Sequence, residues 1–270
     1  MLRTLRLVVL SFSALGLLST AACQVSTEDG KIILEPAKRF NGSPETGSEA
    51  WNAGQPIVVF NDNGNTKIVA DSSVAEVSVV GRPFAFDAEE EDAKKTIEEK
   101  LNLKVATENG EIVVAATMAG SGSYGYDLEV HIPSNFDGAL DVQQGNGDVE
   151  LASMGHAIAT RVTSDNGDIT VKNVTLAGRI ELTTRLGDIE ASILPTGSDK
   201  SVVRTNMGDV TLGIPASAAN LTIHAYSEDG LVTYPESWAA NGEESNVSIT
   251  LGEGTTELEV SSGNGDVTLH

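Results

Sequence analysis

Apolar and polar residues alternate in short runs along most of the chain from residue 56 onward, and glycines separate these runs. Four of the runs are nearly the same: GNGDVEL at 145–151, DNGDITV at 165–171, NMGDVTL at 206–212 and GNGDVTL at 263–269. Side chains two positions apart in a strand point to the same face of a sheet, and glycine accepts the positive φ of a tight turn. Each run therefore predicts a turn at the glycine followed by a strand with one apolar face.

The runs recur at a nearly fixed period. The glycines are spaced by 20, 20, 21 and 22 residues at Gly147, Gly167, Gly187, Gly208 and Gly230. Outlying copies centre on Gly64, Gly110 and Gly265. Such a period is typical of stacked units that bury their apolar faces only against one another, and with 4% aromatic residues the core must be aliphatic. The sequence predicts an all-β fold, a right-handed β-solenoid-like stack of coils of about 20 residues over residues 135–270.

Two segments depart from this pattern. Within an N-terminal β region at 55–134, a helix is predicted over about 87–101, with Asp87 as N-cap and Glu90 as its capping-box partner. Its expected buried stripe is Ala93, Ile97 and Leu101. Later, SITLGEGTTELEV at 248–260 predicts a hairpin that turns at residues 252–254.

The first 22 residues have the features of a secretory signal peptide. Arg3 and Arg6 precede a mostly apolar run at residues 7–18, which is too short to span a bilayer as a helix. The stretch LLSTAAC then ends at Cys23 and resembles a bacterial lipobox, although Thr20 stands where such motifs usually have Leu or Val. We expect lipidation of Cys23; the alternative is an ordinary signal peptide with an incidental cysteine.

Residues 23–54 are rich in Gly, Pro, Ser, Asn and charge, and we expect them to form a lipidated tether. By resemblance to enterobacterial sorting, Gln24 after the cysteine favours the outer membrane. Cys23 is the only cysteine in the sequence, so no disulfide within the chain is expected.

The chain is strongly acidic, with a formal net charge of −22. Removing residues 1–22 takes away two of the 17 basic residues and none of the 39 acidic ones, which changes the charge to −24. Such a surface repels nucleic acid and anionic lipid headgroups. We therefore expect no nucleic-acid partner, whereas divalent cations remain compatible.

Acids that follow the repeated glycines are the clearest candidates for chemistry. In a stack of coils they would line up about 5 Å apart, where two unit charges repel by about 1 kcal/mol in water. Partly buried, such a ladder would favour Ca²⁺, a cation that takes carboxylate ligands. The alternative is that each acid caps its turn and stays solvated. The possible cation ladder is Asp148, Asp168, Asp188 and Asp209; no other cofactor is expected.

Catalytic and sugar-binding candidates are sparse. The histidines, without metal-ligand spacing, are His131, His156, His224 and His270. Arginines that could join the acids in a polysaccharide lyase or hydrolase are Arg161, Arg179, Arg185 and Arg204. Aromatic residues that could stack on a sugar are Tyr124, Tyr126, Tyr226, Tyr234 and Trp238. For Tyr234 a core position is the alternative, and for Trp238 a lid over the end of the stack.

The order of segments over residues 56–270 resembles a bacterial family of adhesins related to the head-GIN domain of proposed autotransporter adhesins. The matching segments are IVVFNDNGNTKIVA, AEVSVVG, a helix of the DAEEEDAKKTIEEKL type, NLKVATENGEIVVAA, YDLEVHIPSNF and the G-D-apolar repeats. The resemblance implies a secreted or surface-anchored β-rich protein with repeated coils and no known ligand.

We therefore expect a non-enzymatic cell-envelope lipoprotein, an adhesin or structural surface module. It would be held to the membrane through the lipid on Cys23 and would face an unknown protein or glycan partner. Two alternatives remain: a regulatory envelope protein that acts through a protein partner, and a carbohydrate-active enzyme on a β-helix.

Overall fold

The computed structural model describes residues 23–28, 31–154, 157–172, 176–197, 199–215 and 220–270. Within these ranges the protein is almost entirely strand, with one helix, α1 (Glu90–Lys100). A hairpin of β1 (Cys23–Glu28) and β2 (Lys31–Pro36) forms its own small sheet. All other strands form one continuous curled sheet, which confirms the β-solenoid-like fold.

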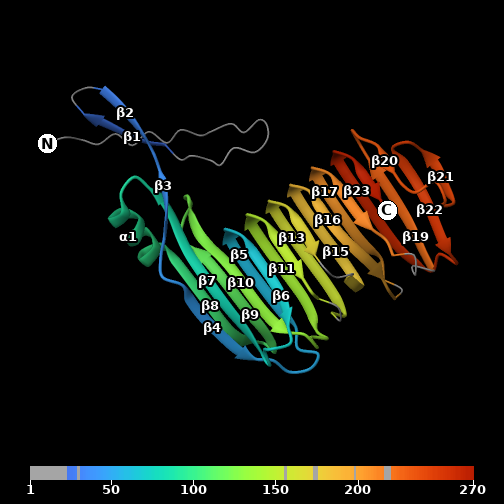
Figure 1. The fold of residues 1–270 in the computed structure, drawn as a ribbon, viewed down its shortest axis with the longest axis horizontal. Coiled ribbons are helices and arrows are strands. Elements are labelled where there is room, and N and C mark those ends of the chain that lie inside the picture. Colours follow the sequence, from blue (N-terminus) through green and yellow to red (C-terminus); the bar gives the residue numbers. More distant parts are fainter. Residues whose placement is uncertain (1–22, 29–30, 155–156, 173–175, 198, 216–219) are drawn as a thin grey trace.

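The strands of the curled sheet lie in two long layers, which we call sheet 1 and sheet 2 (Figure 1). Sheet 1 begins with β3 (Lys38–Asn41) and β4 (Glu45–Ala50), both paired with β7 (Glu76–Asp87), and continues through β10 (Tyr124–Pro133), β6 (Thr66–Asp71), β12 (Val149–Ala152), β14 (Ile169–Lys172), β16 (Ile189–Pro195), β18 (Val210–Gly213), β24 (Val267–Leu269) and β20 (Val232–Thr233). Sheet 2 runs through β8 (Leu101–Glu108), β9 (Glu111–Met118), β5 (Ile57–Asn63), β11 (Ala139–Asn146), β13 (Ala159–Asn166), β15 (Leu176–Leu186), β17 (Ser201–Met207), β23 (Thr256–Asn264), β19 (Asn220–Ser227), β22 (Asn246–Gly252) and β21 (Ala240–Glu243).

The repeats align in register because each coil sends the same positions inward. Val142, Val162 and Leu182 lie opposite one another on parallel strands, and all three are fully buried. Burying one such side chain contributes about 1.5–3 kcal/mol. The core is therefore a set of aliphatic ladders between sheets 1 and 2, as the alternation predicts.

The coils do not stack in chain order at the C-terminal end. β23, from the last repeat, lies between β17 and β19 and pairs with both in parallel. The hairpin predicted at 248–260 is therefore wrong: β19 separates β22 from β23. The turn at residues 252–254 carries the chain across β19 instead of joining two neighbouring strands.

The predicted tether is also too long. Lys38–Asn41 and Glu45–Ala50 are strands that pair antiparallel with the edge of β7. Gly47 sits close to Val105 of β8, because a Cβ at this glycine would lie 2.7 Å from the valine's Cγ2. These residues therefore close the N-terminal end of the stack and cannot act as a free linker.

Helix α1 is shorter than predicted and begins differently. Its N-cap is Glu89, which makes no side-chain capping hydrogen bond, while Asp87 ends β7 and accepts the backbone N–H of Ala88 at 2.7 Å. Ala93 is the fully buried member of the expected stripe, and Ile97 packs beside it. The helix therefore covers the edge formed by β3, β7 and β10 with one narrow face. It is too short and too polar to cross a bilayer, and it is the only helix in the ranges that the structure describes.

Candidate functional site

The acids that follow the repeated glycines form one column along an edge of the stack, which we call the Asp column. In each coil the Oδ1 atom accepts a hydrogen bond from the backbone N–H of the equivalent residue in the next coil. The column begins at Asn65, which accepts from Asp148 at 3.0 Å. The backbone N–H of Asp168 donates to Asp148 Oδ1 at 3.0 Å, and that of Asp188 donates to Asp168 Oδ1 at 2.8 Å. In the same way Asp209 donates to Asp188 at 2.8 Å and Asp266 to Asp209 at 2.7 Å.

The Asp column is a chain of turn caps. It ends where Leu231 replaces the acid and donates its N–H to Asp266 at 2.9 Å. The four predicted cation-ladder residues therefore lie side by side, with their side chains exposed and one oxygen of each engaged by an amide. Within the described part of the chain, no three His, Cys, Asp or Glu side chains are grouped so that they could hold a metal ion. Binding of Ca²⁺ to this column is not shown by these contacts and stays the alternative to turn capping.

A second column lies inside the turns and was not predicted. Three residues before most of the repeated glycines stands a buried polar side chain, and most of these side chains donate to the glycine carbonyl oxygen of the neighbouring coil. Thr184 and Thr205 donate to the oxygens of Gly167 and Gly187 at 3.0 and 2.8 Å. Ser262 and Ser227 do the same to Gly208 and Gly265 at 2.8 and 2.7 Å. The signal in the sequence was a polar residue at an inward position of each strand.

The glycines bring the coils close enough for both columns. At Gly187, φ is +148°, and a Cβ would lie 2.2 Å from the carbonyl oxygen of Gly167. A side chain at this position would push adjacent coils apart. The repeated glycine is therefore required both for the turn and for the spacing between coils.

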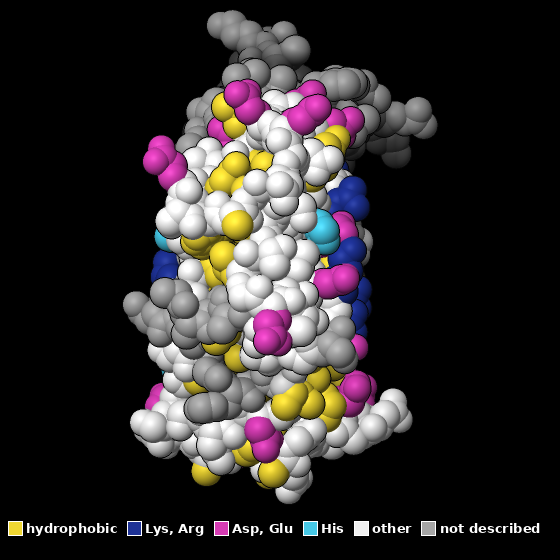
Figure 2. All heavy atoms as spheres, turned by 90° about the vertical axis from the view of Figure 1, so that its right-hand side faces the viewer, with side chains coloured by type: hydrophobic (Ala, Val, Ile, Leu, Met, Phe, Trp, Pro, Cys, Tyr) yellow, Lys and Arg dark blue, Asp and Glu magenta, His cyan; other side chains and the backbone are white. Residues whose placement is uncertain are grey.

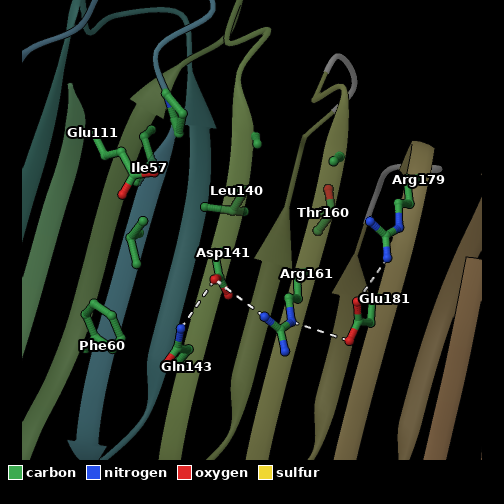
Figure 3. A pocket seen from close by; sticks show the side chains of 14 residues that line it. Ile57, Phe60, Glu111, Leu140, Asp141, Gln143, Thr160, Arg161, Arg179 and Glu181 are labelled. Carbon is green, nitrogen blue, oxygen red and sulfur yellow. Dashed lines mark hydrogen bonds and ion pairs between the residues drawn. The ribbon is translucent and has the colours of Figure 1, made fainter. Parts of the chain in front are cut away.

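The outer face of sheet 2 carries a hollow of 450 Å³ over β5, β11, β13 and β15 (Figure 3). It forms where the small side chains of Ala139 and Ala159 stand between larger neighbours. Val58 and Phe60 of β5 line one side and are only half-buried. This volume falls in the usual range of small-molecule sites, roughly 300–1,000 Å³.

Alternating charges cross the hollow from strand to strand. Arg161 lies between two carboxylates, with its Nη1 atom 4.0 Å from Asp141 Oδ2 and its Nε atom 3.4 Å from Glu181 Oε1. Arg179 Nη2 lies 3.7 Å from the other oxygen of Glu181, and Gln143 donates to Asp141 at 3.3 Å. Figure 3 shows these side chains as one row of contacts. The row places planar polar groups on the same outer face as Phe60.

Comparison with known families identifies the chain. The family described as Toastrack DUF4097 matches residues 84–196 and 156–270, and together these ranges cover more than half of the sequence. The chain belongs to the Toastrack DUF4097 family. The two matches overlap within the regular coils, as expected for a repeated Toastrack architecture.

One solved structure shares this fold at low sequence identity, and a second is similar over much of its length. The structure of a "putative cell adhesion protein" from Clostridium sporogenes ATCC 15579 is 13% identical, with a TM-score of 0.51, over 84% of this chain and 99% of that one. A "putative adhesin" from Bacteroides fragilis NCTC 9343 is 12% identical, with a TM-score of 0.31, over 84% of this chain and 97% of that one. None of the curated proteins matches the chain.

The aromatic candidates divide into buried and exposed residues. Tyr124 and Tyr126 are 9% and 1% exposed, and Tyr234 and Trp238 pack against the core of the Toastrack domain. Trp238 therefore sits at the C-terminal end of the stack as a lid. Tyr226, 43% exposed, lines a smaller hollow of 330 Å³ on sheet 2. Phe60, beside the larger hollow, was not among the candidates.

Histidines and arginines are not gathered into one site. His131 lies on sheet 1 between Asp71 and Glu129, at 3.5 and 3.4 Å. His224 and Arg204 line the smaller hollow, and His270 lines another on sheet 1. Arg185 lies outside these hollows and donates to Asn166 Oδ1 at 2.8 Å. His156 lies outside the described residues. The structure thus brings Arg161 and Arg179 together with acids of sheet 2, away from the Asp column.

Proposed function

We propose that the chain is a non-enzymatic cell-envelope lipoprotein that acts as an adhesive or structural surface module. The observation that carries this proposal is the Asp column. Its carboxylates and the buried hydroxyls behind them are used to bind each coil to the next. Because these side chains hold neighbouring coils together, they favour a rigid scaffold with two long flat faces. Such a scaffold suits the presentation of a surface to a partner.

The larger hollow supports binding more than catalysis. A glycoside hydrolase needs one carboxyl group that protonates the leaving group and a second that acts as base or nucleophile. Here Asp141 and Glu181 lie on either side of Arg161 and both pair with it, so neither carboxyl group of this pair is free for such a role. This arrangement suits a fixed recognition surface.

Localisation at the envelope is part of the same proposal. Among the similar solved structures, the C. sporogenes protein bears the name "putative cell adhesion protein". In this chain the LLSTAAC stretch supports lipidation of Cys23, and Gln24 supports the outer membrane. Cys23 begins β1, so a lipid there would be attached directly to the first strand of the small hairpin.

The test uses the full chain expressed in a bacterial host. The wild-type chain should incorporate radiolabelled palmitate, fractionate with the outer membrane and raise adherence of the cells to polystyrene, to polysaccharide-coated dishes or to a lawn of the same cells. The control variant Cys23→Ala should lose the label and the adherence together. Wild-type cells that carry the chain on their envelope and adhere no better than cells without it would contradict the proposal.

A further inference from the structure

We infer that the larger hollow of sheet 2 binds a neutral glycan, through Phe60 and Val58 on one side and the Asp141–Arg161–Glu181 row on the other. This inference rests on the proposed adhesive function and names the class of ligand for it. An aliphatic-and-aromatic wall beside fixed planar polar groups matches the two faces of a sugar ring, one of C–H groups and one of hydroxyls.

The apolar wall breaks the pattern of the later coils. Val58 lies opposite Asp141 and Phe60 opposite Gln143 in the register of β5 and β11, and all four point outward. On the next strand the same two positions are Arg161 and Thr163. An aromatic ring left half-exposed on a sheet face offers a stacking surface. Only the β5 end of the hollow supplies one, so the orientation of a bound sugar chain is fixed relative to the charged row.

The charged row suits hydroxyl groups better than ions. Arg161 and Arg179 face Asp141, Glu181 and Glu111, so the hollow has a formal charge of −1 and does not favour an anion. A cation would have to displace an arginine from a carboxylate that it already pairs with. A sugar hydroxyl both donates and accepts, and it can use a guanidinium N–H and a carboxylate oxygen of the same row.

One polar atom of the row has no hydrogen-bond partner in the described part of the protein. It is Oδ1 of Asp141, whose other oxygen, Oδ2, accepts from Gln143. Buried polar atoms in folded proteins are almost always hydrogen-bonded, and an exception calls for a partner such as an ordered water or the hydroxyl group of a ligand. Its position in the same hollow as Phe60 and Arg161 is a second reason to place a hydroxyl-bearing ligand there.

The experiment is a binding survey of the full chain in detergent. The probes are neutral oligosaccharides of the cello, xylo, manno, malto and chito series, with polygalacturonate and hyaluronate oligomers as acidic probes, and titration calorimetry measures each affinity. At least one neutral series should bind, and Phe60→Ala and Arg161→Ala should each weaken it at least tenfold. Phe60→Tyr, which keeps the ring, should bind like the wild type. Tyr226→Ala and Arg204→Ala, in the smaller hollow, are the matched controls and should change nothing.

Three results would overturn the inference: no neutral series binds, only acidic probes bind, or Phe60→Ala binds as tightly as the wild type while melting at the same temperature. The same variants in the adherence assay separate the two proposals. Adherence that persists in Phe60→Ala and is not blocked by free oligosaccharide leaves the adhesive function standing without this site. Glycan binding by a chain that confers no adherence leaves the site and contradicts the adhesive function.

Discussion

At the level of single residues, the Asp column contains its own comparison. Asn65 occupies the first position and accepts the N–H of Asp148 through Oδ1 as the aspartates do in later coils. An amide can therefore replace the carboxylate wherever the acceptor oxygen alone matters. This identity of geometry indicates that charge is secondary to hydrogen bonding in the column.

Asp188 tests this reading of the column. Asp188→Ala should lower the free energy of unfolding by about 1 kcal/mol, because the N–H of Asp209 loses its acceptor. Asp188→Asn should cost only a few tenths of a kcal/mol, about what a surface substitution does. Urea denaturation of both variants measures the difference. An Asn variant as destabilised as the Ala variant would show that the negative charge itself is required.

At the level of elements, local pattern predicted the strands and not their neighbours. The coils that contain Gly147, Gly167 and Gly187 stack in chain order, because the chain passes from each coil directly to its neighbour. The last repeat has the same local sequence, so nothing in it indicates that β23 would lie between β17 and β19. Strand β4, ETGSEA, lacks alternating apolar residues because it contributes mainly backbone to the edge of β7. Such a strand cannot be recognised by periodicity.

An ion-pair row links three strands of sheet 1 and gives the fold a pH dependence. Glu150 of β12 lies 2.6 Å from Lys172 Nζ on β14 and 3.0 Å from Lys67 Nζ on β6. The hydrogen bond from Lys172, followed by that from Lys67, holds the pKa of the Glu150 carboxyl below its ordinary value of 4.5. A lowered pKa in the folded state contributes stability that is present above pH 4.5 and is lost as the pH falls through the lowered pKa.

Glu150→Gln should therefore remove part of the acid sensitivity. The variant should cost less than about 1 kcal/mol at pH 7, since the pairs are partly exposed, and its stability should fall less steeply than that of the wild type below pH 4.5. Thermal unfolding between pH 7 and pH 3 gives both curves. Glu236→Gln, in an exposed loop, is the control. Parallel curves for Glu150→Gln and the wild type would contradict the role of the row.

At the level of the whole molecule, rigid faces and acidity go together. Figure 2 shows acidic side chains scattered over the C-terminal end of the stack, with apolar side chains visible between them. With a net charge of −22, such a body resists self-association while its flat faces stay available to a partner. The sequence predicted the stack and its acidity. It did not predict the hollow, because the outward direction of Val58 and Phe60 depends on the register between β5 and β11.

The acids of the repeats hold the coils together through hydrogen bonds to the backbone of the next coil. The most direct test is the thermal unfolding midpoint of the full chain in EDTA, then in Ca²⁺, with NaCl at matched ionic strength as reference. We predict the same midpoint in Ca²⁺ and in NaCl, and the same response for the double variant Asp168→Asn/Asp188→Asn. A rise that is specific to Ca²⁺, reversed by EDTA and absent from the double variant would contradict the account and make the column a cation site.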